Sequence, residues 1–304
     1  MKNKMMALWI GVIGISLVFT GCGSAKNSEN SKTYTVGSGV EQTGTETSEV
    51  QIGSQEKDTD TTESAAVSPV TGETISLKIV DGAKDGNLIL AGAGTNDVYS
   101  LSVDEIPVYL DGEMADAAVL EDGMIADISY NGTVMETFPA MLGEVDGIYV
   151  YSRGSRQNPG GSLYDLSGLY LKVLEDLWEE DPGMNDGSEY ISVDLSEAPG
   201  NLTEGEKTAI AWIFAREHDG QMLTLSYREL VDQGYVQNYT WENGILFLIS
   251  SNSGVTEYYS LPVVKFNAEK WRSGTGAYYF EDCQAIWSEM GTWEDYSVGE
   301  YAIS

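Results

Sequence analysis

Between residues 74 and 151 the apolar residues come in short alternating runs separated by turn residues. The run at 75–79 alternates strictly between apolar and polar positions, which is the pattern of a strand with one buried face. Asn131-Gly132 is a strong signal for a two-residue hairpin. We expect this turn to join a strand over 124–130 to a returning strand over 134–138.

The density of these strands predicts a compact β domain. Five or six expected strands in fewer than eighty residues favour a small closed or half-closed barrel. The segment that begins at Asp122-Gly123 and continues through Met135-Glu136-Thr137-Phe138-Pro139-Ala140 resembles the little OB-like barrels of secreted proteins in Gram-positive bacteria. The resemblance covers about a quarter of the chain and implies an OB-like fold, without an activity.

The pattern changes to a helical one after a polar linker at 152–161. Apolar residues recur every three or four positions from Leu166 to Trp178, which predicts a helix. Thr203 followed by Glu206 forms the sequence signature of a capping box, so a second helix is expected to begin there. The same signature at Ser226 with Glu229 predicts a third, shorter helix.

The last seventy residues read as strands, which we place at 245–250, 257–266, 277–288 and 301–304. Helices followed by hairpin-linked strands indicate an α+β domain with an antiparallel sheet, here over 162–304. The fold class expected for the whole chain is therefore a small all-β barrel followed by an α+β domain. The closing segment is similar to envelope proteins of unknown function in gut Firmicutes, and this similarity implies no mechanism.

The N-terminus resembles the signal of a bacterial lipoprotein. Lys2 and Lys4 precede an apolar run at 5–18, and the run ends at Phe19-Thr20-Gly21-Cys22. The resemblance implies that residues 1–21 are removed and that Cys22 carries a diacylglycerol thioether, with fatty chains such as palmitate. Leucine usually stands where Phe19 stands, which is a mild departure. The alternative is an uncleaved membrane helix with Cys22 just outside it.

A lipidated Cys22 would place the protein at the cell membrane, on its extracytoplasmic face. Two or more acyl chains anchor stably, whereas one does not. Residues 22–73 are rich in Ser, Thr, Gly, Glu, Gln and Asp and contain almost no large apolar residue. Such a segment buries too little apolar surface to offset its ordering entropy, so we expect a disordered stalk between the anchor and the folded domains.

The composition excludes several functional classes. A formal charge of -32 gives a strongly acidic surface, which disfavours nucleic acid as a partner. If the anchor uses Cys22, Cys283 has no partner within the chain, and we expect no disulfide-linked partner either. One histidine and one remaining cysteine cannot build the usual zinc sites, and no cofactor motif is present. We therefore expect no metal, no cofactor and no catalytic residue of the common classes.

Two sequence features have a structural and a chemical interpretation. His218 lies near the expected end of the second helix, where a cation is favourable, although a catalytic dyad with Cys283 is conceivable in space. The segment 179–189 is dense in oxygen ligands for calcium but lacks the EF-hand spacing. We favour the structural interpretation of each feature.

The strongest ligand-binding candidates are Lys270, Trp271 and Arg272, which precede a glycine turn in an otherwise acidic chain. Arg272 could bind a carboxylate while Trp271 stacks on a sugar or a peptide. The alternative is a hairpin whose cations neutralise neighbouring acids. The tyrosine pairs at 258–259 and 278–279 could line a similar surface, although neighbouring residues of a strand point to opposite faces.

These observations favour a membrane-anchored, non-catalytic binding module of the cell envelope. Its expected partners are the membrane, through the lipid on Cys22, and an envelope glycan or peptide. Two alternatives stay open at this point: a carboxylate-based enzyme that acts on envelope glycans, and a solute-capturing partner of a transporter.

Overall fold

The computed structural model describes residues 72–92, 95–152, 166–258, 261–287 and 293–304. The chain divides into two units at residues 64 and 65, and every described residue belongs to the second unit. The expected signal, Cys22 and the stalk up to residue 71 lie outside the described residues, as does most of the expected linker at 152–161, whereas the last stalk residue, Glu73, begins a strand. Among the described helices, none is long and apolar enough to cross a membrane.

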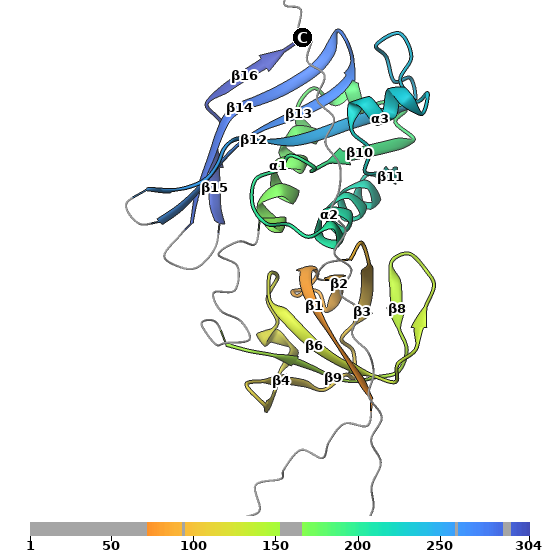
Figure 1. Ribbon diagram of the computed structural model, residues 1–304, viewed down its shortest axis with the longest axis vertical. Coiled ribbons are helices and arrows are strands. Elements are labelled where there is room, and N and C mark those ends of the chain that lie inside the picture. Colours follow the sequence, from red (N-terminus) through yellow and green to blue (C-terminus); the bar gives the residue numbers. More distant parts are fainter. Residues whose placement is uncertain (1–71, 93–94, 153–165, 259–260, 288–292) are drawn as a thin grey trace, which may run out of the picture. The chain divides into compact units, whose positions relative to one another are not determined.

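The first part of the folded chain is a nine-stranded sheet (Figure 1). Its strands are β1 (Glu73–Asp81), β2 (Asn87–Gly92), β3 (Val98–Ser102), β4 (Val108–Leu110), β5 (Glu113–Ala115), β6 (Ile125–Tyr130), β7 (Val134–Met135), β8 (Ala140–Leu142) and β9 (Val145–Val150). A 3-10 helix, η1, spans Ala117–Val119. The hydrogen-bonded order is β5-β4-β9-β6-β1-β2-β3-β8-β7. The all-β prediction for this region is confirmed, but the pairing described here does not close into a barrel, so the OB-like form stays a prediction.

The hairpin predicted at Asn131-Gly132 is wrong. β6 pairs with β1 and β9, whereas β7 pairs with β8. The local reason is that the Asn131 side chain accepts a hydrogen bond from the Thr133 backbone N–H at 3.0 Å. The backbone carbonyl oxygen of Thr133 in turn accepts a hydrogen bond from the Gly143 N–H at 2.8 Å. The chain therefore turns at Asn131 to begin a new hairpin, rather than folding back on β6.

The second sheet has seven strands and is mixed, not purely antiparallel as predicted. Its strands are β10 (Tyr190–Asp194), β11 (Gln221–Leu223), β12 (Gly244–Tyr258), β13 (Leu261–Ser273), β14 (Gly276–Trp287), β15 (Trp293–Ser297) and β16 (Glu300–Ile303). β12 to β16 pair antiparallel as expected, but β10 is parallel to both β11 and β12. The parallel pair arises because a helix lies between β10 and β11, and a helical crossover joins parallel neighbours.

The three predicted helices are confirmed. They are α1 (Ser167–Glu179), α2 (Glu204–Glu217) and α3 (Tyr227–Asp232), and a short 3-10 helix, η3, spans Pro182–Asn185. Both predicted capping boxes form, with Thr203 and Ser226 as the N-caps. The Glu206 carboxylate of the first box also forms an ion pair with Lys78 of β1, so α2 is tied to the first sheet as well as to the second.

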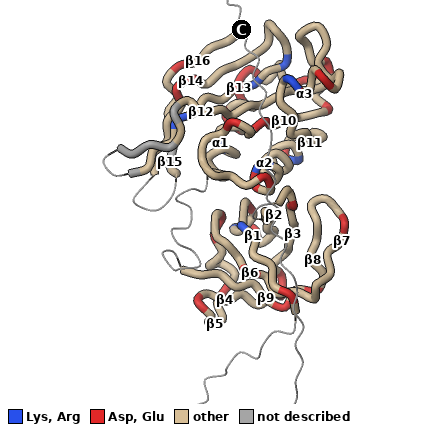
Figure 2. The backbone as a smooth tube through the Cα atoms, viewed as in Figure 1, with Lys and Arg blue, Asp and Glu red and all other residues tan. Residues whose placement is uncertain are grey.

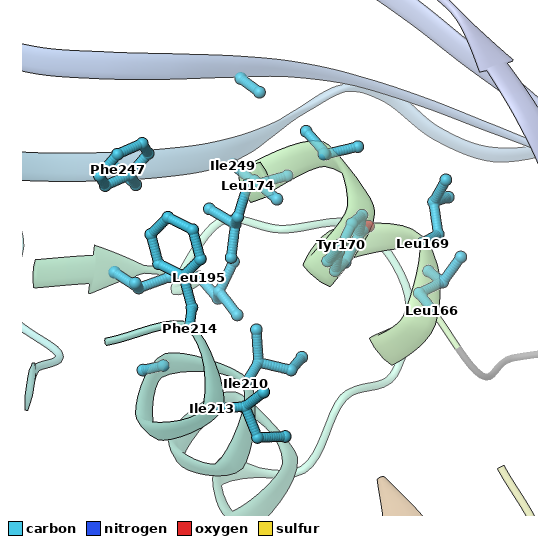
Figure 3. Close-up of a cluster of buried hydrophobic side chains, with 14 of the residues drawn as sticks. Leu166, Leu169, Tyr170, Leu174, Leu195, Ile210, Ile213, Phe214, Phe247 and Ile249 are labelled. Atoms are coloured by element: carbon cyan, nitrogen blue, oxygen red, sulfur yellow. The ribbon is translucent and has the colours of Figure 1, made fainter. Parts of the chain in front are cut away.

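One hydrophobic core fills the space between the two sheets. Its side chains come from α1, α2 and one face of the second sheet, and Figure 3 shows their interdigitation around Phe214, Phe247 and Tyr170. Val80, Ile89, Ala91 and Val98 of the first sheet belong to the same cluster. The core is therefore continuous from the first sheet to the second, with α2 packed between them.

The opposite face of the second sheet carries a smaller core. Leu246 of β12 points into it, whereas its neighbours Ile245 and Phe247 point into the large core. This alternation is the ordinary consequence of strand geometry. α3 and the chain that follows it cover this face through Leu230 and Val236. The candidate functional site lies against this smaller core.

Candidate functional site

A cleft of about 490 Å³ opens beside this smaller core. Tyr190 enters it from the start of β10, and Tyr235 enters it from the chain that follows α3. The remaining polar wall comes from Gln237, Asn238, Thr240, Glu242 and Asn243. We call this site the tyrosine cleft. Its volume lies within the usual range of small-molecule sites, about 300 to 1,000 Å³.

Two half-buried tyrosine rings form the aromatic part of the tyrosine cleft. The ring centroids of Tyr190 and Tyr235 are 5.6 Å apart, and their planes meet at 63°. Tyr235 also packs edge to face on Trp241, at 5.9 Å between centroids. Trp241 is fully buried. The tyrosines are thus held by a rigid aromatic support, and rings that are already ordered lose little entropy when a ligand binds.

A tight turn presents the amide wall. Gln237 and Thr240 exchange two backbone hydrogen bonds, of 3.0 and 2.9 Å. Between them, Asn238 and Tyr239 both have positive φ, at 48° and 59°. Two successive positive φ values are typical of a type I′ turn, in which Asn is favoured but Tyr is unusual. A tyrosine at positive φ is a strained backbone position, which persists only where the surrounding structure holds it.

Much of the hydrogen-bonding capacity of the cleft is unused within the described residues. Asn238 and the hydroxyls of Tyr190 and Tyr235 have no hydrogen-bond partner there, and none of the three is among the residues with further contacts. Asn243 donates from Nδ2 to Glu189 at 3.1 Å, which leaves its Oδ1 as an acceptor. An amide side chain both donates and accepts, as a sugar hydroxyl does. The wall therefore offers both hydrogen-bond donors and acceptors to a ligand.

Arg272, predicted to bind a ligand, lies behind this cleft and holds its wall. Its guanidinium donates to the carbonyl oxygens of Met184 and Asp186 at 2.6 Å each, and to that of Glu242 at 2.7 Å. Glu242 lines the tyrosine cleft. The structure thus gives Arg272 a positioning role, because its planar fork of donors suits several carbonyl oxygens at once.

Lys270 and Trp271 are both buried. The Lys270 ammonium donates to the carbonyl oxygens of Trp178 at 3.2 Å and Glu180 at 2.5 Å. Burial lowers the pKa of Lys270 to about 8. Trp271 points to the other face of β13, where it packs edge to face on Tyr227. In this structure the three candidates contact the protein itself, so their binding of an external ligand stays a prediction.

His218 and Cys283 occupy separate structural settings. His218 is the C-cap of α2; its ring stacks on Trp178 at 3.9 Å, and its Nε2 lies 3.0 Å from a Glu175 oxygen. Burial lowers the pKa of His218, although Glu217 opposes this effect. Cys283 is fully buried in the large core, and burial raises its thiol pKa to about 12. A thiol with so high a pKa is a poor nucleophile at neutral pH.

Backbone oxygens of the acidic segment 179–189 accept hydrogen bonds from Lys270 and Arg272. No group of three metal-ligating side chains occurs among the described residues. Tyr278 and Tyr279 lie against the large and the small core respectively, as the alternation predicted. Tyr259 and the side chain of Tyr258 lie outside the described residues.

Sequence reasoning missed Tyr190 and Tyr235, which are forty-five positions apart. The one local signal was the Asn238-Tyr239 pair after a helix stop, which is consistent with a turn. Searches of protein-family models, curated proteins and solved structures find no match to this chain.

Proposed function

We propose that this protein is a non-catalytic binding module of the cell envelope, anchored by a lipid on Cys22, and that the tyrosine cleft binds a neutral saccharide. The observation that carries the proposal is that Tyr190 and Tyr235 share one cleft with the unpartnered amide of Asn238 and the open Oδ1 of Asn243. Aromatic faces stack on the apolar face of a sugar ring, while amides bind its hydroxyls.

The charge distribution supports a neutral ligand. No cation lines the tyrosine cleft, and Glu242 is the one carboxylate among its lining residues. The usual glycosidase mechanism needs two carboxyl groups on either side of the scissile bond. A single lining carboxylate therefore favours binding over hydrolysis at this site.

Titration of the full-length protein with chitotetraose, cellotetraose, maltotetraose and mannotetraose tests the proposal. We expect at least one of these to bind with a dissociation constant of roughly 1 mM or below. Tyr235→Leu keeps an apolar contact with Trp241 but removes the aromatic face, and it should weaken binding about tenfold. Asn238→Gly keeps the positive φ while it removes the amide, and it should also weaken binding.

Tyr301→Ala is the matched control, because this exposed tyrosine lies on β16. It should leave the affinity unchanged. Absence of binding for all four sugars at roughly 10 mM would overturn the proposal. So would equal affinity of the Tyr235→Leu variant and the wild type. Release of reducing ends during incubation would favour the enzyme alternative.

Replacement of Cys22 by alanine tests the anchor. We expect the variant to be released from membranes or to stay unprocessed, because the thioether that holds the acyl chains can no longer form. Membrane fractionation with palmitate labelling measures the outcome. A palmitate-labelled mature species in the Cys22→Ala variant would refute the lipid anchor and leave saccharide binding by the tyrosine cleft untouched.

A further inference from the structure

A second cleft, of about 530 Å³, opens where α2 packs across the first sheet. Trp212, Arg216 and Glu217 of α2 form one wall, and Asp81 and Asp85, at the turn from β1 to β2, belong to another. Ser100 of β3 is also among its lining residues. We call this site the arginine cleft. It shares no lining residue with the tyrosine cleft.

The guanidinium of Arg216 is held in place but unpaired. Its Cζ lies 4.7 Å from the centroid of the Trp212 ring, one helical turn earlier. Stacking fixes the plane of a guanidinium and leaves its N–H edges free for an anion. In the part of the chain that the structure describes, the Arg216 side chain forms no hydrogen bond and no ion pair, and Arg216 is not among the residues with further contacts.

Arg216 lies in a strongly acidic chain, in which some cations of the described segments pair with carboxylates while others, such as Lys84 and Lys265, do not. Acidic residues predominate along the tube in Figure 2, and the formal charge is -32. Lys78, Lys172 and Lys207 each form an ion pair with a carboxylate. Burial and the nearby Glu175 raise the pKa of the neighbouring carboxyl, Glu217, which forms no ion pair with Arg216 within the described residues. Arg216 is thus a fixed cation that is available to a ligand.

The carboxylates at the turn supply the opposite charge. Asp81 and Asp85 line the same cleft, and within the described residues their side chains form no hydrogen bond or ion pair. Within the described residues, neither carboxylate forms an ion pair with Arg216. The charges of the cleft are therefore not neutralised by direct pairing. A ligand that carries a carboxylate at one end and an ammonium at the other would satisfy both walls.

We propose that the arginine cleft binds a short peptide in its zwitterionic form. The C-terminal carboxylate of the peptide lies on the guanidinium edge of Arg216, and its N-terminal ammonium lies at Asp81 and Asp85. The volume is sufficient for a small ligand of this kind. This site is separate from the tyrosine cleft and does not depend on the saccharide proposal.

Calorimetric titration of the full-length protein with trialanine, N-acetyl-trialanine and trialanine amide tests this inference. We expect trialanine to bind, and each blocked peptide to bind at least about tenfold more weakly. Raising the salt concentration should weaken trialanine binding, because both contacts are electrostatic. Galacturonic acid serves as a probe for an acidic sugar.

Arg216→Gln should weaken trialanine binding about tenfold, yet it should leave the affinity for trialanine amide unchanged, because the amide lacks the group that Arg216 binds. Arg228→Gln is the matched control, since Arg228 is 90% exposed on α3, and it should bind trialanine as the wild type does. Saccharide binding should persist in Arg216→Gln, which separates the two sites.

Three results would overturn the inference. The first is no trialanine binding at roughly 10 mM. The second is a loss in Arg216→Gln that is the same for trialanine and its amide. The third is tighter binding of galacturonic acid than of trialanine, which would assign the cleft to an acidic sugar.

Discussion

Replacement of Lys270 by methionine should lower the free energy of unfolding by about 3 kcal/mol. Methionine fills a similar volume, so the loss comes from the hydrogen bonds and not from a cavity. The buried ammonium donates to the carbonyl oxygens of Trp178, Glu180 and Asp181. Without it, these oxygens stay desolvated and unpaired. Chemical denaturation followed by tryptophan fluorescence measures the change.

The effect of Lys270 should also depend on pH. Burial lowers the pKa of Lys270 to about 8, whereas the unfolded value is about 10.4. Between these values the unfolded chain binds more protons than the native one, so rising pH favours the native state through this group. The stability of the wild type relative to Lys270→Met should therefore increase from about pH 8 to about pH 10.

Lys265→Met is the control for both effects, because Lys265 lies on the same strand and is only half-buried. Its cost should stay within about 0.5 kcal/mol. An equal loss of stability in the two variants would contradict the role assigned to Lys270. If the difference in the free energy of unfolding between the wild type and Lys270→Met stayed constant across the pH range, this would contradict the lowered pKa of Lys270.

Replacement of Gly244 by alanine should destabilise the protein by about 3 kcal/mol and also weaken saccharide binding. A Cβ at Gly244 would lie 2.0 Å from the Trp241 ring. Trp241 is fully buried and supports Tyr235, so it cannot move aside without displacing the tyrosine cleft. Thermal unfolding and sugar titration give the two measurements.

Gly168→Ala is the matched substitution, because Gly168 lies in α1 with nothing within 4 Å of its added Cβ. It should be neutral or stabilise the protein by up to about 1 kcal/mol, since alanine is the better helix former. Wild-type stability in Gly244→Ala would show that Trp241 is free to move. Lost stability with full sugar affinity would show that Trp241 does not support the cleft.

Local signals were sufficient to predict the helices. The capping boxes at Thr203 and Ser226 involve residues three positions apart, so the sequence displays them directly. Strand pairing was harder to predict because it depends on distant partners. Asn131-Gly132 has the residues of a hairpin turn. However, β1 and β9 occupy the two edges of β6, so β7 cannot pair with it.

The candidate site was beyond sequence reasoning for a similar reason. Tyr190 and Tyr235 meet because the Tyr190 side chain, at the start of β10, and the chain after α3 pack against the same small core on one face of the sheet. Arg272 was predicted from the sequence to bind a ligand, and this stays a prediction. Its partners, however, are backbone oxygens of distant loops, and no pattern in the sequence marks a carbonyl as unsatisfied.

The most direct measurement of the central claim is a crystal structure of the full-length protein with a bound neutral tetrasaccharide. The proposal predicts a sugar ring against Tyr235 or Tyr190, with its hydroxyls hydrogen-bonded to Asn238 and to Oδ1 of Asn243. A saccharide seated elsewhere on the protein, with the tyrosine cleft holding only solvent, would contradict it.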